Sequence, residues 1–169
     1  MAILSTDIKF LLSGGAVNTD VNLALGGIPS STEIVDSTLH NLFDIVYGAE
    51  ALVGDVEYRC IYILNDHATL TLQTALTWIS VNTPSTASTI DIGLGTSAVS
   101  GTEQTVVDES TPPVGVTFTS PSTLLTGLAI GDLIPSATKA LWIRRTITAA
   151  AGPYDLDTVT INAGGDTAA

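Results

Sequence analysis

Two adjacent arginines, Arg144 and Arg145, are the first candidates for chemistry in this sequence. They lie in the apolar run ALWIRRTIT, and the whole chain has only five lysine and arginine side chains. Such a pair could bind an anion, form salt bridges or face a partner. Residue alternation predicts a strand over Thr138–Thr148, and neighbouring strand residues point to opposite faces of a sheet. A regular strand therefore cannot aim both guanidinium groups at one anion.

Alternation gives the two arginines different surroundings. Arg145 shares its face with leucine and isoleucine, whereas Arg144 shares its face with threonines and Trp142. We expect Arg145 to form a structural ion pair, because an unpaired buried charge is too costly. We expect Arg144 to be available to a partner. The assignment reverses if Trp142 marks the core, and a bulge between the two arginines would also change it.

Two short motifs resemble ligand-binding loops. The segment GLGTSA (93–98) matches G-x-G-x-x-A, but VSGTEQ follows it without the helical periodicity that a dinucleotide site needs. The segment NTDVN (18–22) alternates oxygen-bearing side chains, as calcium loops do. Positions 6 and 12 of that loop hold Leu23 and Pro29 in place of glycine and glutamate. The sequence therefore predicts ordinary loops here, with no cofactor and no metal.

The residue types most used in catalysis are scarce. His40 and His67 are the only histidines, Cys60 is the only cysteine, and their spacing fits no zinc site. Cys60 shares a strand face with Tyr58 and Tyr62, which indicates a small buried residue rather than a nucleophile. The chain has no G-x-S-x-G elbow, although a catalytic triad assembled in space stays open. We expect no catalytic residues, and hence no enzyme.

These side chains must be positioned by strands, because period-2 alternation is the main signal along the chain. In 70–79 the even positions form an apolar face and the odd positions a mixed one. In 56–64 the even positions run from Val56 to Leu64, with Glu57 and Arg59 on the other face. The turn residues Asn65–Ala68 separate these two segments, so the sequence predicts a hairpin.

Further strands complete the predicted fold class. Proline falls at the expected strand ends or in loops, where a missing N–H does not interrupt a ladder. Many short strands with such punctuation indicate an all-β protein, a single-domain antiparallel β-sandwich or jelly roll over residues 1–169. The additional strands are expected at Asp7–Leu12, Ser88–Leu94, Glu103–Val107, Gly115–Phe118, Thr138–Thr148 and Thr158–Asn162.

Three segments depart from this pattern. Over Asp36–Val53 apolar residues have helical spacing, with Asp36 or Ser37 as an N-cap and Gly48 as a stop, so this segment is one short helix or a packed loop. For residues 1–6, which include Ile3 and Leu4, the alternatives are an N-terminal arm against a neighbour, a strand of their own sheet and a disordered segment. The small residues at 163–169 predict a mobile tail.

Composition limits the partners. A net charge of −12 opposes binding to nucleic acid and to an anionic membrane surface. The N-terminus lacks the basic region of a signal peptide, and no segment has the length of a spanning helix. Cys60 has no intrachain disulfide partner, which fits assembly in a reducing compartment. A protein or a sugar is therefore the expected partner.

Three long segments together resemble a known class of viral protein. They are DIKFLLSGGAVNTDVNLALGG, NLFDIVYGAEALVGDVEYRCIYILND and KALWIRRTITAAAGPYDLDTVTINAGGDTAA. They resemble structural proteins of tailed-bacteriophage head-gene clusters, in particular capsid decoration (cement) proteins. The resemblance implies a β-rich protein, made in the bacterial host cytoplasm, that binds the outer capsid surface of the virion. It also implies the major capsid protein as partner, bridging of neighbouring subunits, and a homo-oligomer, either dimer or trimer.

The resemblance offers no motif from which contact residues can be carried over. We expect the partner interface to include Ile3 and Leu4 of the N-terminal arm and Arg144 on the threonine face of its strand. Two alternatives are a phage tail or fibre accessory module and a carbohydrate-binding β-sandwich. The latter usually presents an exposed aromatic platform, whereas Trp78 and Trp142 both lie in apolar strand contexts.

Overall fold

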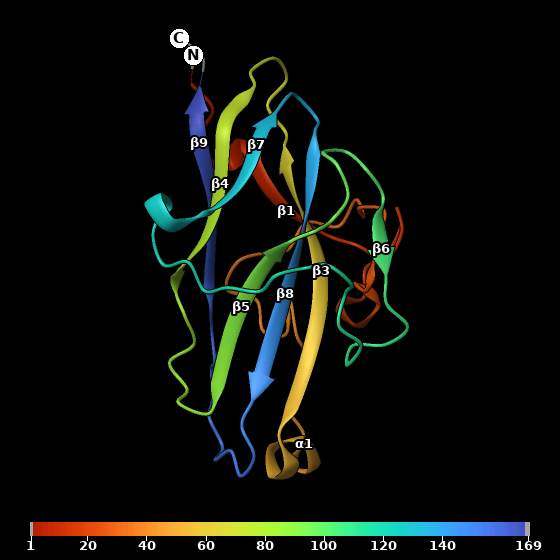
Figure 1. Cartoon of the computed structure of the whole chain (residues 1–169), viewed down its shortest axis with the longest axis vertical. Coiled ribbons are helices and arrows are strands. Elements are labelled where there is room, and N and C mark those ends of the chain that lie inside the picture. Colours follow the sequence, from red (N-terminus) through yellow and green to blue (C-terminus); the bar gives the residue numbers. More distant parts are fainter. Residues whose placement is uncertain (1, 168–169) are drawn as a thin grey trace.

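The computed structural model describes residues 2–167, and its strands form antiparallel sheets, which is the all-β sandwich expected from the alternation (Figure 1). The strands are β1 (Ile8–Leu12), β2 (Gly26–Gly27), β3 (Asp55–Asn65), β4 (Leu72–Val81), β5 (Ser88–Leu94), β6 (Glu103–Thr105), β7 (Leu128–Leu133), β8 (Thr138–Ile147) and β9 (Thr160–Thr167). The four-stranded sheet has the order β1-β3-β8-β5, the three-stranded sheet has the order β7-β4-β9, and β2 pairs with β6.

Helical structure is confined to short segments. The one α-helix in the described part of the chain is α1 (Gly48–Val53), and 3-10 turns occupy η1 (Ser5–Asp7), η2 (Val21–Leu23) and η3 (Leu124–Thr126). Among residues 2–167, no helix is both long and apolar enough to cross a membrane.

The four-stranded sheet is buried on both faces. On one face, Ile61 and Ile143 belong to the core cluster that packs against the three-stranded sheet. On the other face, Tyr62 and Trp142 belong to a second cluster, which is covered by Phe118 and other residues of the loop after β6. This two-sided burial explains why β3 and β8 are apolar at both odd and even positions.

A bulge changes the phase of β4. Thr74 has a positive φ of 49°, and the register with both neighbouring strands shifts on either side of it. Ala75 and Ile79 therefore face the core, whereas Leu76 and Trp78 fall on the opposite, half-buried face. The prediction that the even positions of 70–79 form one apolar face is wrong beyond this bulge.

The hairpin predicted between β3 and β4 is also wrong. Strand β3 pairs with β1 and β8, while β4 pairs with β7 and β9, so the connection crosses from one sheet to the other. The Asn65 amide donates to the carbonyl oxygens of Leu70 (2.9 Å) and Leu133 (2.8 Å), and His67 Nδ1 accepts from the amide of Leu70. The turn forms as predicted, but β4 does not pair with β3 because β1 and β8 occupy both edges of β3.

Other differences concern segments with weak alternation. The strand expected at Gly115–Phe118 is a loop whose neighbour Thr119 forms an isolated bridge with Ile92. Strand β7 was not predicted, because its glycine and aspartate interrupt the apolar pattern. Strand β9 begins at Thr160 and extends to Thr167 rather than ending at Asn162.

The segment 36–53 is a packed loop followed by a short helix. Residues Ser37 and His40 have φ values of 59° and 57°, which a continuous helix does not allow. Phe43 is buried in the core, and Gly48 begins α1 instead of ending a helix. Burial of Phe43 therefore outweighs the local helical spacing.

The two ends of the chain also differ from expectation. Ile3 packs against its own core, so the arm alternative is not what the structure shows for this residue, whereas Leu4 is exposed. Met1 and residues 168–169 lie outside the described residues. In place of the expected mobile tail, β9 extends as far as Thr167 and pairs with β4. Gly165 allows this pairing because its backbone passes close to β4. A Cβ at this position would lie 2.5 Å from the carbonyl oxygen of Gln73.

This close approach is testable with Gly165→Ala. The added methyl group must displace backbone, so we expect the free energy of unfolding to fall by about 1–3 kcal/mol in urea titrations. Gly152→Ala is the matched control, since a Cβ there meets no atom within 4 Å. Equal stability of the two variants would contradict the close packing of β9.

Candidate functional site

Strand β8 places Arg144 and Arg145 on opposite faces, and each has a carboxylate directly across from it. Asp91 of β5 is in register with Arg144, and Glu57 of β3 with Arg145. Arg144 Nη2 lies 2.6 Å from Asp91 Oδ2, with the guanidinium 5.1 Å from the centroid of the Phe118 ring. Arg145 donates to the Glu57 carboxylate. The side chain of Arg144 is 34% exposed and that of Arg145 is 11% exposed.

A third arginine is buried more deeply than either of these. Arg59 of β3 lies on the same face as Glu57, and its side chain is 0% exposed. Its Nη2 donates to the Glu109 carboxylate and, at 2.9 Å, to Asn22 Oδ1. Its guanidinium carbon lies 5.4 Å from the centroid of the Phe43 ring, and that of Arg145 lies 4.6 Å from it. One phenyl ring thus contacts both cations.

We call this group the arginine cluster. Its members come from two neighbouring strands and from two loops, which the cluster holds against the sheet. They are Arg59, Arg145, Glu57, Asp44, Glu109 and Phe43.

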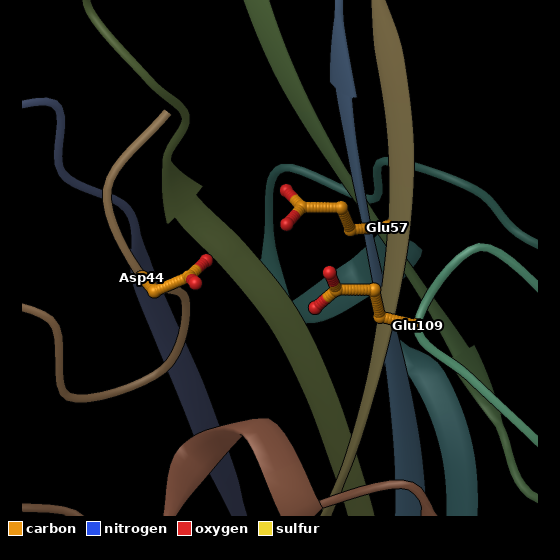
Figure 2. Close-up of side chains that lie close together, drawn as sticks. All are labelled: Asp44, Glu57 and Glu109. Carbon is orange, nitrogen blue, oxygen red and sulfur yellow. The ribbon is translucent and has the colours of Figure 1, made fainter. Parts of the chain in front are cut away.

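Three carboxylates of the arginine cluster converge. Oxygen atoms of Asp44, Glu57 and Glu109 all lie within 4.8 Å of one another, and Figure 2 shows Glu57 and Glu109 extending toward Asp44. Such a trio has the composition of a cation site, but two guanidinium groups already lie among these oxygens. Arg145 Nη2 is 3.6 Å from Asp44 Oδ1, and Arg59 Nη2 is 4.0 Å from the same atom. We therefore interpret the trio as the acidic half of an ion-pair cluster.

Some charged groups of the arginine cluster are only partly compensated by their neighbours. Burial raises the pKa of Glu57, although hydrogen bonding and attraction to Arg145, together with the charge of Arg59, oppose that rise. The Nε of Arg59 and the Nη2 of Arg145 are buried without a hydrogen-bond acceptor. Each ion in the cluster therefore depends on its existing partners, and removal of one would leave another uncompensated.

An open pocket of about 350 Å³ lies beside the cluster. It offers carboxylates, one amide and two aliphatic side chains, and no hydroxyl, thiol or histidine is among the lining residues. These are Asn22, Leu25, Asp44, Val107, Asp108 and Glu109. This chemistry supports no catalytic assignment.

The remaining candidates for catalysis lie apart from one another. His40 is exposed on the loop before α1, where it lines a second pocket of about 220 Å³ together with Glu33, and His67 accepts backbone hydrogen bonds in the turn after β3. Cys60 is fully buried, as its shared face with two tyrosines predicted, and burial raises the pKa of its thiol. Burial also raises the pKa of Tyr62 to about 12. The Cys60 thiol is therefore protonated and shielded from solvent at neutral pH.

The glycine motif binds a carboxylate of its own chain. The amides of Thr96 (3.2 Å) and Ser97 (2.9 Å) donate to Glu103, and a Cβ on Gly95 would collide with that carboxyl group. Burial raises the pKa of Glu103, but hydrogen bonds from Ser97 and Thr96 outweigh it, and the pKa falls to about 2. The loop therefore forms an internal anion site, which is filled.

The calcium-like segment is likewise used internally. Asn18 Oδ1 accepts from the Asp20 amide, and Asp20 Oδ1 accepts from the Asn22 amide, both at 2.9 Å. Asn22 Oδ1 accepts from Arg59. These oxygens stabilise a turn and link it to the arginine cluster.

The three residues predicted for a partner interface do not form one surface. Ile3 is half-buried against the core, Leu4 is exposed beside η1, and Arg144 is held by Asp91 and Phe118 in the four-stranded sheet. Their role in an interface stays a prediction.

A separate set of exposed apolar side chains lies at the end of the molecule occupied by α1 (Figure 1). The amides of Ala150 and Ala151 donate to the carbonyl oxygens of Leu52 (3.1 Å) and Ala51 (2.9 Å), so the loop after β8 is fixed to α1. Apolar side chains of both segments are at least half exposed here. We call this surface the apolar tip: Tyr47, Leu52, Val53, Tyr154 and Leu156.

The sequence carries a signal for part of the arginine cluster. The ionic side chains of Glu57 and Arg59 precede Ile61 and Ile63 on one strand face, which is a signal for buried ion pairs. Asp44 and Glu109 belong to loops, and nothing in their local sequence indicates that they meet. Long-range folding alone brings them to Arg59.

Comparison with protein-family models, with curated proteins and with solved structures finds no match for this chain. The functional class must therefore be argued from the fold and its surfaces.

The ion pairs predict unequal roles for the two adjacent arginines. Arg145→Ala leaves the buried carboxylate of Glu57 without its main partner, so we expect a loss of about 3–5 kcal/mol in the free energy of unfolding at neutral pH. Arg144→Ala removes a partly exposed pair and should cost at most about 1 kcal/mol. Urea denaturation of both variants measures this difference. A larger loss for Arg144→Ala would reverse the assignment.

The lowered pKa of Glu103 predicts a loss of stability in acid. A carboxyl group whose pKa falls from 4.5 to about 2 on folding contributes stability above pH 4.5, and this contribution disappears as the pH falls toward 2. The contribution is about 3 kcal/mol. Urea denaturation between these pH values should therefore show a smaller acid-induced loss for Glu103→Gln than for the wild type. An identical loss in both proteins would refute the role of Glu103.

Proposed function

We propose that this protein is a structural component of a tailed-bacteriophage virion. In this proposal it binds the outer surface of the assembled capsid and stabilises the shell by bridging major capsid subunits. The resemblance of three long segments to capsid decoration proteins motivates the proposal, and the all-β sandwich fold is compatible with it.

The apolar tip is the observation that carries the proposal. Leu52 is 70% exposed and Leu156 is 72% exposed, and both lie in segments that hydrogen bonds hold together. Exposed apolar side chains gathered at one end of a folded domain indicate a protein contact. A contact at one end of an elongated sandwich leaves the remainder of the molecule free to reach a neighbouring subunit.

The interior of the sandwich suits a passive brace. Both faces of the four-stranded sheet are packed, and the arginine cluster holds the loops containing Asp44 and Glu109 against that sheet. A contact surface whose loops are fixed in advance loses little conformational entropy on binding. Many copies on a regular lattice would add their individually modest contacts through multivalency.

The charge of the protein fits the outside of a shell. A net charge of −12 gives no electrostatic attraction to packaged DNA. Contacts through apolar side chains need no cationic groups, and every cationic side chain of this chain already has a partner within its own fold.

The test uses purified phage shells that lack this protein. We expect the wild-type protein to bind them saturably and to raise the temperature at which they disrupt. The double variant Leu52→Asp/Leu156→Asp should bind at least about tenfold more weakly, because it places charges in the apolar contact. Val17→Asp is the matched control, since Val17 is an exposed valine outside the apolar tip.

Failure of the wild-type protein to bind such shells, or to change their heat resistance, would contradict the proposal. If Val17→Asp lost binding to the same extent, the apolar tip would no longer be supported as the contact surface. Immunogold labelling of the tail instead of the head would favour a tail or fibre accessory module.

A further inference from the structure

Strand β9 is an open edge of the three-stranded sheet. Within residues 2–167 it forms backbone pairs with β4 alone, and no isolated bridge joins its other side. It lies along one side of the molecule (Figure 1). An edge strand presents unpaired N–H and C=O groups, and folded proteins usually cover or disrupt such edges.

The other edges are covered or disrupted. Along β1, the Leu12 amide donates to Thr32 (3.0 Å) and the Ile34 amide donates to Phe10 (2.8 Å). Along β5, Ile92 exchanges hydrogen bonds with Thr119. Strand β7 is broken by a register shift and by Gly131, which has a φ of 90°. Strand β9 has no comparable protection among the described residues, and it contains neither lysine nor proline.

The outward-facing backbone groups of β9 can be assigned. Thr77 Oγ1 donates to the carbonyl oxygen of Asn162, and Ser80 Oγ donates to that of Thr160, so these carbonyl groups point toward β4. Backbone groups alternate in direction along an antiparallel strand. The N–H and C=O groups of Ile161, Ala163 and Gly165 therefore point away from β4, toward the open side.

We propose that β9 pairs with β9 of a second copy of this chain, antiparallel and about a twofold axis. Because the outward-facing residues are odd-numbered, each odd-numbered residue of one copy must lie opposite an odd-numbered residue of the other. The central register places Ala163 opposite Ala163 and Ile161 opposite Gly165. The two three-stranded sheets then join as one continuous sheet across the dimer.

The composition of β9 allows a second copy to approach this edge in spite of the net charge. Two chains with a net charge of −12 repel each other, but β9 carries only one charged residue, Asp166. In the central register each Asp166 faces Thr160, which puts the two carboxylates about 20 Å apart at a rise of about 3.4 Å per residue. That separation exceeds the Debye length of about 8 Å at physiological salt. The small residues Ala163, Gly164 and Gly165 also give the partner strand close access.

The experiment measures the mass of the purified full-length chain by light scattering across a concentration series. We expect the wild type to reach the mass of two chains, and Ala163→Pro to keep the mass of one chain. Proline at this site removes an outward N–H and places a ring where the partner strand would lie, which an edge strand tolerates. Leu125→Asp is the control, because it removes a highly exposed apolar side chain outside β9 and should leave the dimer intact.

Amide hydrogen exchange by NMR gives a second measurement on the unaltered chain, in case the proline variant fails to fold. The amides of Ile161 and Ala163 should become protected only at high protein concentration, whereas the Asn162 amide should be protected at all concentrations. A one-chain mass at every concentration, or exchange at Ile161 and Ala163 that does not depend on concentration, would overturn the proposal. Neither measurement uses capsids, so its outcome is independent of the proposed function.

Discussion

Burial of the Arg59 guanidinium inside the sandwich is the constraint on which much of the remaining structure depends. A guanidinium cannot lose its charge by deprotonation at physiological pH, so a fully buried arginine must bring acceptors with it. Its own strand cannot supply enough of them, since Glu57 is engaged by Arg145. The carboxylates of Asp44 and Glu109 therefore come from loops, and Phe43 comes with the first of these.

This requirement explains how loops without regular structure acquire fixed positions. The segment 36–47 has left-handed residues and no helix, yet Phe43 is buried and Asp44 contacts two arginines. The loop after β6 is attached through Glu109 in the same way. In the segment 36–47, charge pairing with the sheet supplies order that regular secondary structure does not. In the loop after β6, it acts together with backbone hydrogen bonds such as that from the Tyr58 amide to the Glu109 carbonyl oxygen (2.7 Å). The surfaces that these loops present are consequently defined before any partner arrives.

The sequence predicted local structure better than pairing. Strands β5 and β8 match their expected ranges closely, because their alternation is strong and their ends are marked by turn residues. The hairpin after β3 failed, since a turn sequence does not specify whether the next strand returns to the same sheet. The prediction of one apolar face along 70–79 failed for a related reason. The bulge at Thr74 contains one left-handed residue, and this reverses the face of every side chain beyond it. For the site, alternation separated Arg144 from Arg145, but the loop carboxylates depend on contacts between distant segments.

The use of the five cationic side chains also limits how the protein can contact others. Lys9 lies 2.8 Å from Asp66, Lys139 donates to the carbonyl oxygens of Gly95 and Ser97, and the three arginines have carboxylate partners. The outer surface is therefore acidic, with no cationic group free of an internal partner among the described residues. An approaching acidic protein is repelled at long range, and attraction must come from groups that act at contact. The chain offers two of these, apolar side chains at the apolar tip and backbone groups along β9, and they lie on different elements, so the use of one leaves the other available.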